Sequence, residues 1–335
     1  MALKVEKYFG YPLDIEFGFD GEKFALLQSR RIRGLELISE TSTAIEENRH
    51  RLTTLANGKK RVWISHNLSE TLKYPTPLTW DIVRHFMSGA GGMGEMYRQL
   101  GYSVAENESE EFLELICGNI YADPDKIVSM LWRGLPVSCD LNTLGTDVTY
   151  LDNPPVLLAP EKADALLLLR LPSVTWGSIA SWMKIKKLKR SAKNSFENDH
   201  LPGFLDYVKE ERGKDLKTMS DRELRELLSS RRRCVLRDFG AATLIPGFIG
   251  ALSMKNLTTL LQRLLGESEG QAMSQIFTAG MNSISSQQYQ LISRIAAGDA
   301  DMNEFLKQFG HRTSDEMELS IPRWREDHSA LTALI

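Results

Sequence analysis

Residues 14–30 constrain the fold of this chain most strongly, because they have the pattern of a β-hairpin. Two short runs rich in strand-forming residues, 15–19 and 24–27, flank the polar, glycine-containing segment 20–23. Alternation along the first arm, a turn that contains glycine and an apolar second arm are together typical of two antiparallel strands. The sequence therefore predicts a hairpin near the N-terminus.

The length of the hairpin loop decides where its polar side chains point. A three-residue loop, 21–23, places Glu16 directly opposite Gln28 on one face, whereas a two-residue loop, 20–21, places them on opposite faces. Two oxygen donors side by side, with Arg30 just beyond them, suit Mg²⁺, which usually takes one or two protein ligands together with nucleotide phosphates. The alternative is a solvated hairpin that binds nothing.

The composition is that of a soluble globular protein with one large or two ordinary domains. Of the 335 residues, 42% are hydrophobic and 25% are charged, and the net charge of −3 gives no drive towards nucleic acid or an anionic membrane. The three cysteines lie far apart without a C-x-x-C pair, which predicts neither a zinc site nor a disulfide framework. Since the N-terminus carries charges and no apolar signal segment, we expect a cytoplasmic protein.

After the hairpin the sequence is helical almost throughout, which predicts a mainly α fold. We expect a hairpin region, 1–34, followed by a multi-helix domain, 35–335. Thr43 and Glu46 form a capping-box pattern for a helix that ends near Asn57-Gly58. Further helices are expected at 108–117, from Asp123-Pro124 onward, and at 271–279, 286–297 and 302–309, with an irregular connection over 140–160.

Two apolar stretches are expected inside the fold rather than in a membrane. Residues 163–171 are apolar on nearly all sides, which predicts burial. The charge-free run 239–254 has sixteen residues, too few to span a bilayer comfortably, and it contains Pro246 and several glycines. We expect this run to form a buried helix and a turn.

A glycine-rich segment, 89–94, matches the dinucleotide-binding pattern G-x-G-x-x-G. It follows a helical stretch rather than a strand, and no βαβ unit surrounds it. The segment therefore predicts a helix junction or close helix packing, not a nicotinamide site.

Two basic runs lie on expected helices. The first contains Lys184, Lys186, Lys187, Lys189, Arg190 and Lys193, and the second contains Arg231, Arg232, Arg233 and Arg237. Such runs can bind nucleic acid or lipid, but acidic residues are dense around these and no aromatic side chains interleave with the arginines. We expect solvated helix faces, with neither a nucleic acid nor a membrane as partner.

Three motifs occur in order along the chain. They have the forms P-x-D-I-E-[WF] with L-L-Q-[SA]-R, N-[VL]-[GS]-E with T-P-L-T-W, and [YF]-G-H-R with E-x-E-L and P-R-W-x-E-D. The matching residues are Pro12, Asp14–Phe17 and Leu26–Arg30, then Asn67–Glu70 and Thr76–Trp80, then Gly310–Arg312, Glu316, Glu318, Leu319, Pro322–Trp324, Glu326 and Asp327. In these motifs the chain resembles the family of phosphoenolpyruvate synthase, pyruvate phosphate dikinase and rifampicin phosphotransferase. Arg31 departs from the proline that the family usually has there.

The resemblance implies an ATP-grasp edge followed by the helical central domain of an ATP-dependent dikinase. Glu16 and Gln28 would then hold Mg²⁺ on the ATP phosphates, with Arg30 near those phosphates. In this family a histidine on a swivelling domain carries phosphate from ATP to an acceptor such as pyruvate or a larger hydroxylated compound. Magnesium and ATP are thus the implied cofactors.

The sequence has no match to the carrier-histidine pattern of that family, roughly T-S-H-x-A-I-x-A-R. Of the six histidines, His66 comes nearest, and it shares only two letters of the pattern. We therefore expect a catalytically incomplete segment with no catalytic residue of its own and with weak affinity for Mg-ATP. Its ATP-grasp and phosphohistidine partners would be supplied in cis or in trans.

Charged residues cluster in the third motif. They are His311, Arg312, Glu316, Glu318 and Arg323. Such a cluster can line an acceptor pocket or receive a docking domain, or it can be a buried ion-pair network. We favour the structural network.

A second hypothesis treats the chain as a non-catalytic helical scaffold. Its basic helices, above all residues 184–193, would then bind an acidic partner.

Overall fold

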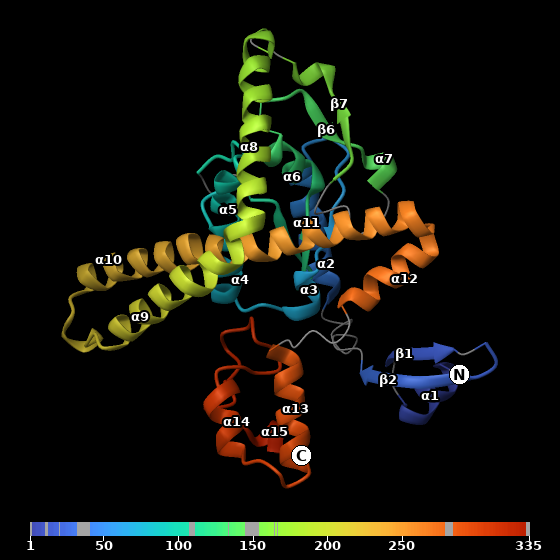
Figure 1. The fold of residues 1–335 in the computed structure, drawn as a ribbon, viewed down its shortest axis with the longest axis vertical. Coiled ribbons are helices and arrows are strands. Elements are labelled where there is room, and N and C mark those ends of the chain that lie inside the picture. Colours follow the sequence, from blue (N-terminus) through green and yellow to red (C-terminus); the bar gives the residue numbers. More distant parts are fainter. Residues whose placement is uncertain are drawn as a thin grey trace. The chain divides into compact units, whose positions relative to one another are not determined.

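A computed structural model describes residues 2–10, 13–19, 21–31, 41–106, 111–132, 134–144, 154–163, 165, 167–278 and 284–332 (Figure 1). The protein is mainly helical, with a short N-terminal antiparallel hairpin and small sheets, as the sequence predicts. It divides into two compact units, Met1–Arg61 and Val62–Ile335. The division falls later than the expected boundary at 34/35.

The first unit contains the predicted hairpin, made of β1 (Leu13–Phe19) and β2 (Phe24–Arg31), preceded by α1 (Ala2–Phe9). Phe19 pairs with Phe24, so the loop is longer than either loop considered from the sequence. A β-bulge next to Phe17 then shifts the register by one residue, and Glu16 pairs with Gln28. The predicted juxtaposition is confirmed, but the bulge produces it and a three-residue loop does not.

The helix expected from Thr43 is α2 (Thr41–Ala56), which also belongs to the first unit. It begins two residues before Thr43, so the predicted capping box does not mark its start. Its end is as predicted, because Asn57 and Gly58 have φ angles of 47° and 73°, in the left-handed region that terminates helices.

The core of the second unit forms where a small sheet meets several helices. The sheet has the order β3-β5-β4, with β3 at Ile64–Ser65, β4 at Leu113–Ile116 and β5 at Asn119–Ala122. The helices are α3 (Leu68–Thr71), α4 (Pro77–Phe86), α5 (Gly92–Leu100) and α6 (Pro124–Leu131). Large side chains such as Leu100, Phe112 and Ile120 are fully buried here.

The helix predicted over 108–117 is wrong in its described part. Residues 113–116 form β4, which pairs with β5 through a tight turn. Cys117 and Gly118 in that turn have φ angles of 47° and 79°, and two successive left-handed residues favour a hairpin turn of type I′. Because this turn feeds two short apolar strands into the core, tertiary burial overrides the local helical pattern.

The connection expected to be irregular is partly ordered. It contains the short helix α7 (Leu141–Leu144), the strand β7 (Val156–Leu158) and the start of the 3₁₀ turn Pro160–Lys162. Strand β7 pairs with β6 (Val137–Cys139), which lies just before the connection. Residues 145–153 lie outside the described part.

Long helices make up the middle of the second unit. They are α8 (Leu167–Ser195), α9 (Leu201–Arg212), α10 (Asp221–Arg232), α11 (Gly240–Leu265) and α12 (Glu267–Thr278). Two π-helical segments, Phe196–His200 and Arg233–Phe239, join α8 to α9 and α10 to α11. Aromatic rings join the two segments, because Phe196 of the first stacks on Phe239 of the second with ring centroids 6.1 Å apart. Phe239 also stacks on Phe204 of α9, with centroids 3.7 Å apart.

Two predictions about apolar stretches need correction. Residues 240–254 form continuous helix within α11, with Pro246 inside it, so no turn interrupts the run. Of the range 163–171, the side chains that the structure describes are not interior, since Leu169 is 76% exposed and Ala163 is exposed as well.

By length and composition alone, one helix in the described residues, Asp221–Leu265, is long and apolar enough to cross a membrane, and 28% of its apolar window is buried. A core helix of a soluble protein meets the same criterion. Ala241, Ile245 and Ile249 of this helix join the core beside α5.

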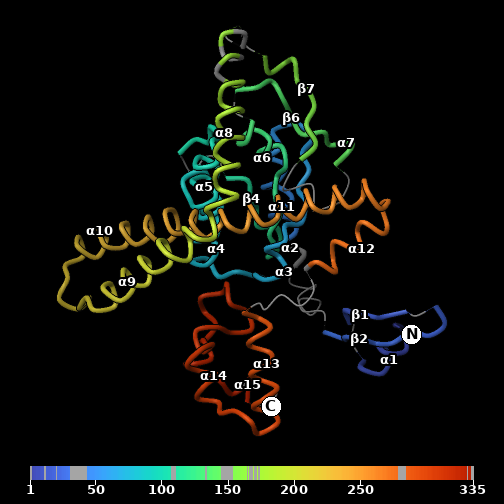
Figure 2. Tube along the Cα trace, in the orientation of Figure 1, coloured from blue at the N-terminus to red at the C-terminus, as the bar shows by residue number. Residues whose placement is uncertain are grey.

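The C-terminal part of the second unit has a small core of its own. It is formed by α13 (Ile284–Ala296), α14 (Met302–Phe309) and α15 (Ser329–Thr332), whose backbone can be followed in Figure 2. Leu291, Phe305, Phe309 and Leu331 are buried there, with Trp324 against Phe305. The helix predicted over 302–309 is confirmed, as are those near 271–279 and 286–297 with shifted ends.

Candidate functional site

The hairpin brings together the three side chains that the sequence singled out. The Arg30 guanidinium donates from one nitrogen, Nη2, to Glu16 Oε1 at 3.1 Å and to Gln28 Oε1 at 2.8 Å. Glu16 and Gln28 are register partners, and Arg30 stands two residues further on the same face of β2. The two oxygens therefore converge on one cationic nitrogen.

These residues fit a magnesium ion that is bound mainly by phosphate. One carboxylate and one amide oxygen are the hard ligands that Mg²⁺ prefers, and the remaining positions would go to phosphates and water. The Arg30 and Glu16 side chains are 57% and 56% exposed, and such an ion pair contributes only about 0–1 kcal/mol. A divalent cation can thus displace the guanidinium at little cost. No group of three His, Cys, Asp or Glu in the described residues is placed to hold a metal.

The opposite face of the hairpin is apolar and open to solvent within the first unit. Phe17, Phe19, Phe24 and Leu26 are all exposed, and the rings of Phe19 and Phe24 stack with centroids 4.5 Å apart. A two-stranded hairpin is at best marginally stable by itself. An apolar face of this kind is therefore suited to packing against further structure.

Glu318, in the third motif, is buried and binds the helix start formed by the second motif. Its carboxylate accepts hydrogen bonds from the backbone N–H of Thr76 at 2.9 Å and from the Thr76 and Thr79 hydroxyls at 2.9 and 2.8 Å. The backbone N–H of Ser320 donates to it at 2.9 Å. Thr76 is the N-cap of α4 and has no side-chain cap bond of its own, so Glu318 caps this helix from 242 residues away.

The protonation of Glu318 reflects these donors. Burial alone would raise the pKa of its carboxyl, but the hydrogen bonds from Ser320, Thr76 and Thr79 outweigh burial and lower the pKa from 4.5 to about 2. Glu318 is therefore a charged structural cap and has no proton to give near neutral pH.

The other charged residues of this cluster also make structural contacts. The Arg312 Nε donates to Glu316, and this bond raises the pKa of the guanidinium. The Arg323 guanidinium donates to the backbone carbonyls of Glu316 at 2.9 Å and Glu318 at 3.4 Å. His311 lies exposed beside them. These contacts are structural, but they are not the buried ion-pair network favoured from the sequence, because of the five residues only Glu318 is buried and both His311 and Glu316 are exposed.

The glycine-rich segment is a helix junction with close packing, as predicted. It joins α4 to α5, and a Cβ on Gly91 would lie 2.0 Å from the His85 carbonyl oxygen. A Cβ on Gly94 would lie 2.2 Å from the Gly89 oxygen. The glycines are therefore explained by backbone contact within the protein.

Sequence reasoning missed an ion-pair cluster at the π-helical segment. Arg237, assigned from the sequence to a solvated basic face, is largely buried and pairs with Glu95 at 3.2 Å and also with Glu106. Glu95 additionally pairs with Arg98 at 3.0 Å. Arg231 of the same basic run pairs with Glu211 at 2.8 Å. These acids lie 20 residues or more from their arginine partners, except for Glu95–Arg98, so local charge counting did not find them.

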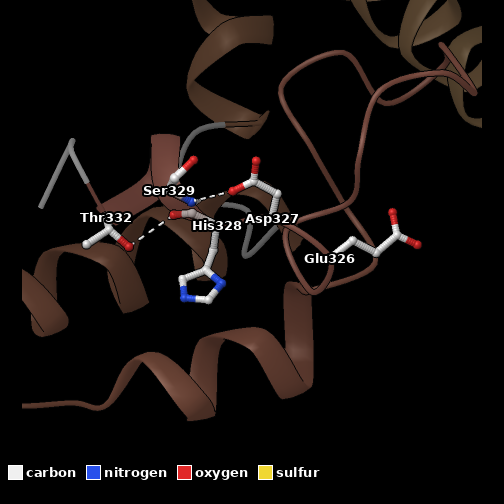
Figure 3. Close-up of a pocket in the computed structure, with 5 residues that line it drawn as sticks. All are labelled: Glu326, Asp327, His328, Ser329 and Thr332. Carbon is white, nitrogen blue, oxygen red and sulfur yellow. Dashed lines mark hydrogen bonds between the residues drawn. The ribbon is translucent and has the colours of Figure 1, made fainter.

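An open pocket of about 520 Å³ lies at the start of α15 (Figure 3). Glu326, Asp327, His328, Ser329 and Thr332 line it. The Ser329 N–H donates to Asp327 at 2.9 Å, and the Thr332 hydroxyl donates to the His328 carbonyl at 3.0 Å. These local bonds form a helix cap, and none of the predicted ligands lines the pocket.

No family model matches the chain, and no curated protein matches its sequence. The candidate site accordingly rests on the hairpin geometry and on the residues of the three motifs.

Proposed function

We propose that the chain is a segment of a phosphoenolpyruvate-synthase-like, ATP-dependent dikinase. The observation that carries the proposal is the convergence of Glu16 Oε1 and Gln28 Oε1 on one cationic nitrogen of Arg30. These are the side chains to which the resemblance assigns the magnesium-nucleotide edge. The second and third motifs, which follow in the same order as in that family, also support the proposal.

In this proposal Glu16 and Gln28 hold Mg²⁺, and Arg30 turns to the ATP phosphates. The bound metal would neutralise phosphate charge during transfer. The phosphate then passes through a phosphohistidine on another domain to an acceptor such as pyruvate or a larger hydroxylated compound. The chain contributes positioning and charge, not the nucleophile.

The apolar face of the hairpin supports a partner for the first unit. Exposed Phe17, Phe19 and Phe24 would pack against the remainder of an ATP-grasp domain, supplied in cis or in trans. The polar face, with Glu16 and Gln28, would then line the nucleotide site.

The contact between the second and third motifs supports a single helical body. Glu318 binds Thr76 and Thr79, so residues matched in two separate motifs form one hydrogen-bonded unit. In the proposed enzyme this unit is the frame against which the mobile carrier domain docks.

A phosphate-transfer assay tests the proposal. The chain is mixed with [β-³²P]ATP or [γ-³²P]ATP, a phosphohistidine domain and an ATP-grasp domain that ends before its own final hairpin, all taken from a phosphoenolpyruvate synthase. We expect the chain to restore histidine labelling of the carrier. Glu16→Ala should lower that labelling roughly 10- to 100-fold, because a metal ligand is lost.

The matched control is Glu22→Ala, which removes a carboxylate from the turn of the same hairpin and should leave labelling unchanged. Labelling of a histidine in the isolated chain would contradict its proposed incompleteness. No restoration by the wild-type chain would contradict the role of the hairpin. Micromolar or tighter Mg-ATP binding by the isolated chain would also argue against an incomplete site.

A second candidate function is a scaffold that binds an acidic partner through α8. All six basic side chains between Lys184 and Lys193 are exposed, and α8 contains no acidic residue. Within the part of the chain that the structure describes, Lys193 is the one of these six placed in an ion pair, with Glu197 at 3.9 Å. This basic surface carries the alternative.

For this alternative we expect binding to poly-glutamate at low salt. Changing the four lysines Lys184, Lys186, Lys187 and Lys189 to glutamine should weaken it roughly tenfold or more, because exposed charges act through screened attraction. The control changes Lys209, Arg222 and Arg225, exposed on α9 and α10, to glutamine. Absence of binding by the wild type, measured by fluorescence titration, would rule out the scaffold function in this form.

A further inference from the structure

Helix α8 has one face that packs on the core. Ile185 and Leu188 pack against the core cluster, and Ala192 is buried in it. Ser181 continues this face, since a Cβ on Gly101, the C-cap of α5, would lie 3.0 Å from the Ser181 Cα. The spacing of these residues, four, three and four, is that of one helix face.

The opposite face of α8 carries an apolar stripe that no other part of the second unit covers among the described residues. Leu169, Pro172, Trp176, Ile179 and Met183 are all exposed, and Trp176 is 69% exposed. Their spacing alternates three and four, and at 100° per residue they lie about 180° from the buried face. In Figure 1 the N-terminal half of α8 extends beyond the helices that surround its C-terminal half.

We propose that this stripe is the contact through which two copies of the chain pair, with their α8 helices antiparallel. The stripe is nearly symmetric about Trp176. Leu169 and Met183 stand seven residues before and after it, and Pro172 and Ile179 stand four before and three after. A two-fold axis at Trp176 therefore brings apolar residues opposite apolar residues along the whole stripe.

The charges of α8 select the antiparallel orientation. The basic residues follow the stripe at its C-terminal end, where Lys186, Lys187 and Arg190 continue the outer face. Antiparallel pairing puts the two basic ends roughly 33 Å apart at 1.5 Å per residue, well beyond the ~10 Å screening length at 0.1 M salt. Parallel pairing would put them at the ~8–10 Å of packed helices, where they repel.

The width of the stripe favours a helix as the occupant. It spans about 80°, narrower than the apolar sector of helices that lie in a membrane surface, and matches the seam of paired helices. With Trp176 as its largest side chain, the five-residue stripe would bury on the order of 500 Å² per copy on pairing. This is below the ~800 Å² of a standard interface, so the dimer should have a micromolar dissociation constant.

Sedimentation velocity of the full chain from 1 to 200 μM tests the pairing. We expect a monomer–dimer equilibrium, and Trp176→Glu should weaken it at least tenfold by placing two carboxylates together at the axis. The control Leu228→Glu, an equally exposed apolar residue on α10, should leave the equilibrium unchanged. A wild type that stays monomeric at 200 μM would overturn the proposal, which does not depend on the dikinase assignment.

Cysteine cross-linking tests the orientation. In a Cys117→Ser background, which removes the exposed native thiol, Trp176→Cys should form a disulfide between copies under mild oxidation. Leu169→Cys should cross-link only when mixed with Met183→Cys. Cross-linking of Leu169→Cys with itself would contradict the antiparallel arrangement. Binding of monomeric protein to phosphatidylserine vesicles that Trp176→Glu abolishes would assign the stripe to a membrane and overturn the pairing.

Discussion

Replacing Glu318 with alanine is expected to destabilise the second unit by about 2–4 kcal/mol. Glu318 is 7% exposed, and its carboxylate accepts hydrogen bonds from Thr76, Thr79 and Ser320. Its removal leaves the buried Thr79 hydroxyl and the N-terminus of α4 without their acceptor, and buried donors without partners carry most of the cost. Urea denaturation followed by circular dichroism measures the loss.

Glu318→Gln separates charge from shape. The glutamine amide has the same volume as the carboxylate, but its NH₂ group would face the N–H and O–H donors that the carboxylate accepts from. We therefore expect a loss of stability nearly as large as for alanine. Glu197→Gln, at an exposed carboxylate 3.9 Å from Lys193, is the matched control and should change stability by less than about 0.5 kcal/mol. A Glu318→Gln variant as stable as wild type would show that the cap contributes nothing.

The pH dependence of stability gives a second readout of the same cap. The pKa of Glu318 is about 2 in the folded protein against an ordinary value of 4.5. Because the folded protein holds the proton less tightly than the unfolded chain, this contribution is complete above pH 4.5 and is lost as pH falls towards 2. Glu318→Gln should lack that part of the acid destabilisation.

The hairpin shows what a sequence can and cannot predict about a site. The strand-forming runs on either side of Gly21 were enough to predict the hairpin. Because side chains alternate between the two faces of a strand, the residues of its polar face could also be predicted. The register did not follow, because it depends on a bulge next to Phe17 that no residue type marks. Relative to a three-residue loop, the longer loop shifts the strand pairing by one residue and the bulge shifts it back by one, so that Glu16 again lies opposite Gln28.

Other misses arose where distant contacts outweigh local pattern. The strand Leu113–Ile116 had helical spacing, but pairing with Asn119–Ala122 across a left-handed turn decided its conformation. Leu169 was expected inside the fold because the residues next to it in the sequence are almost all apolar. In the described part of α8, however, one face packs on the core and Leu169 lies on another, exposed face. Charge counting likewise assigned Arg237 to solvent, although Glu95, 142 residues away, pairs with it. The local sequence therefore predicts many of the helices and strands, whereas contacts between distant residues determine which side chains are buried.

The helix junction at Gly91 should tolerate a single added methyl group poorly. Gly91→Ala is expected to destabilise the second unit by about 3 kcal/mol or more, because its Cβ would lie 2.0 Å from the His85 oxygen and 2.6 Å from the Phe86 oxygen. Both are backbone atoms at the end of α4, so no side chain can rotate away and the junction itself must open. Gly91 also has φ −90°, which alanine adopts freely, so the penalty comes from contact and not from the backbone angle.

Gly247→Ala is the matched control, because the same change there meets no atom within 4 Å. Inside α11 the alanine should stabilise the protein by about 0.5–1 kcal/mol through helix propensity. Thermal and urea unfolding of the two variants beside the wild type should therefore give shifts of opposite sign. If Gly91→Ala came within about 1 kcal/mol of the wild type, the tight α4–α5 contact would be refuted. If Gly91→Ala failed to fold while Gly247→Ala folded normally, the close contact at the α4–α5 junction would explain why residue 91 is a glycine.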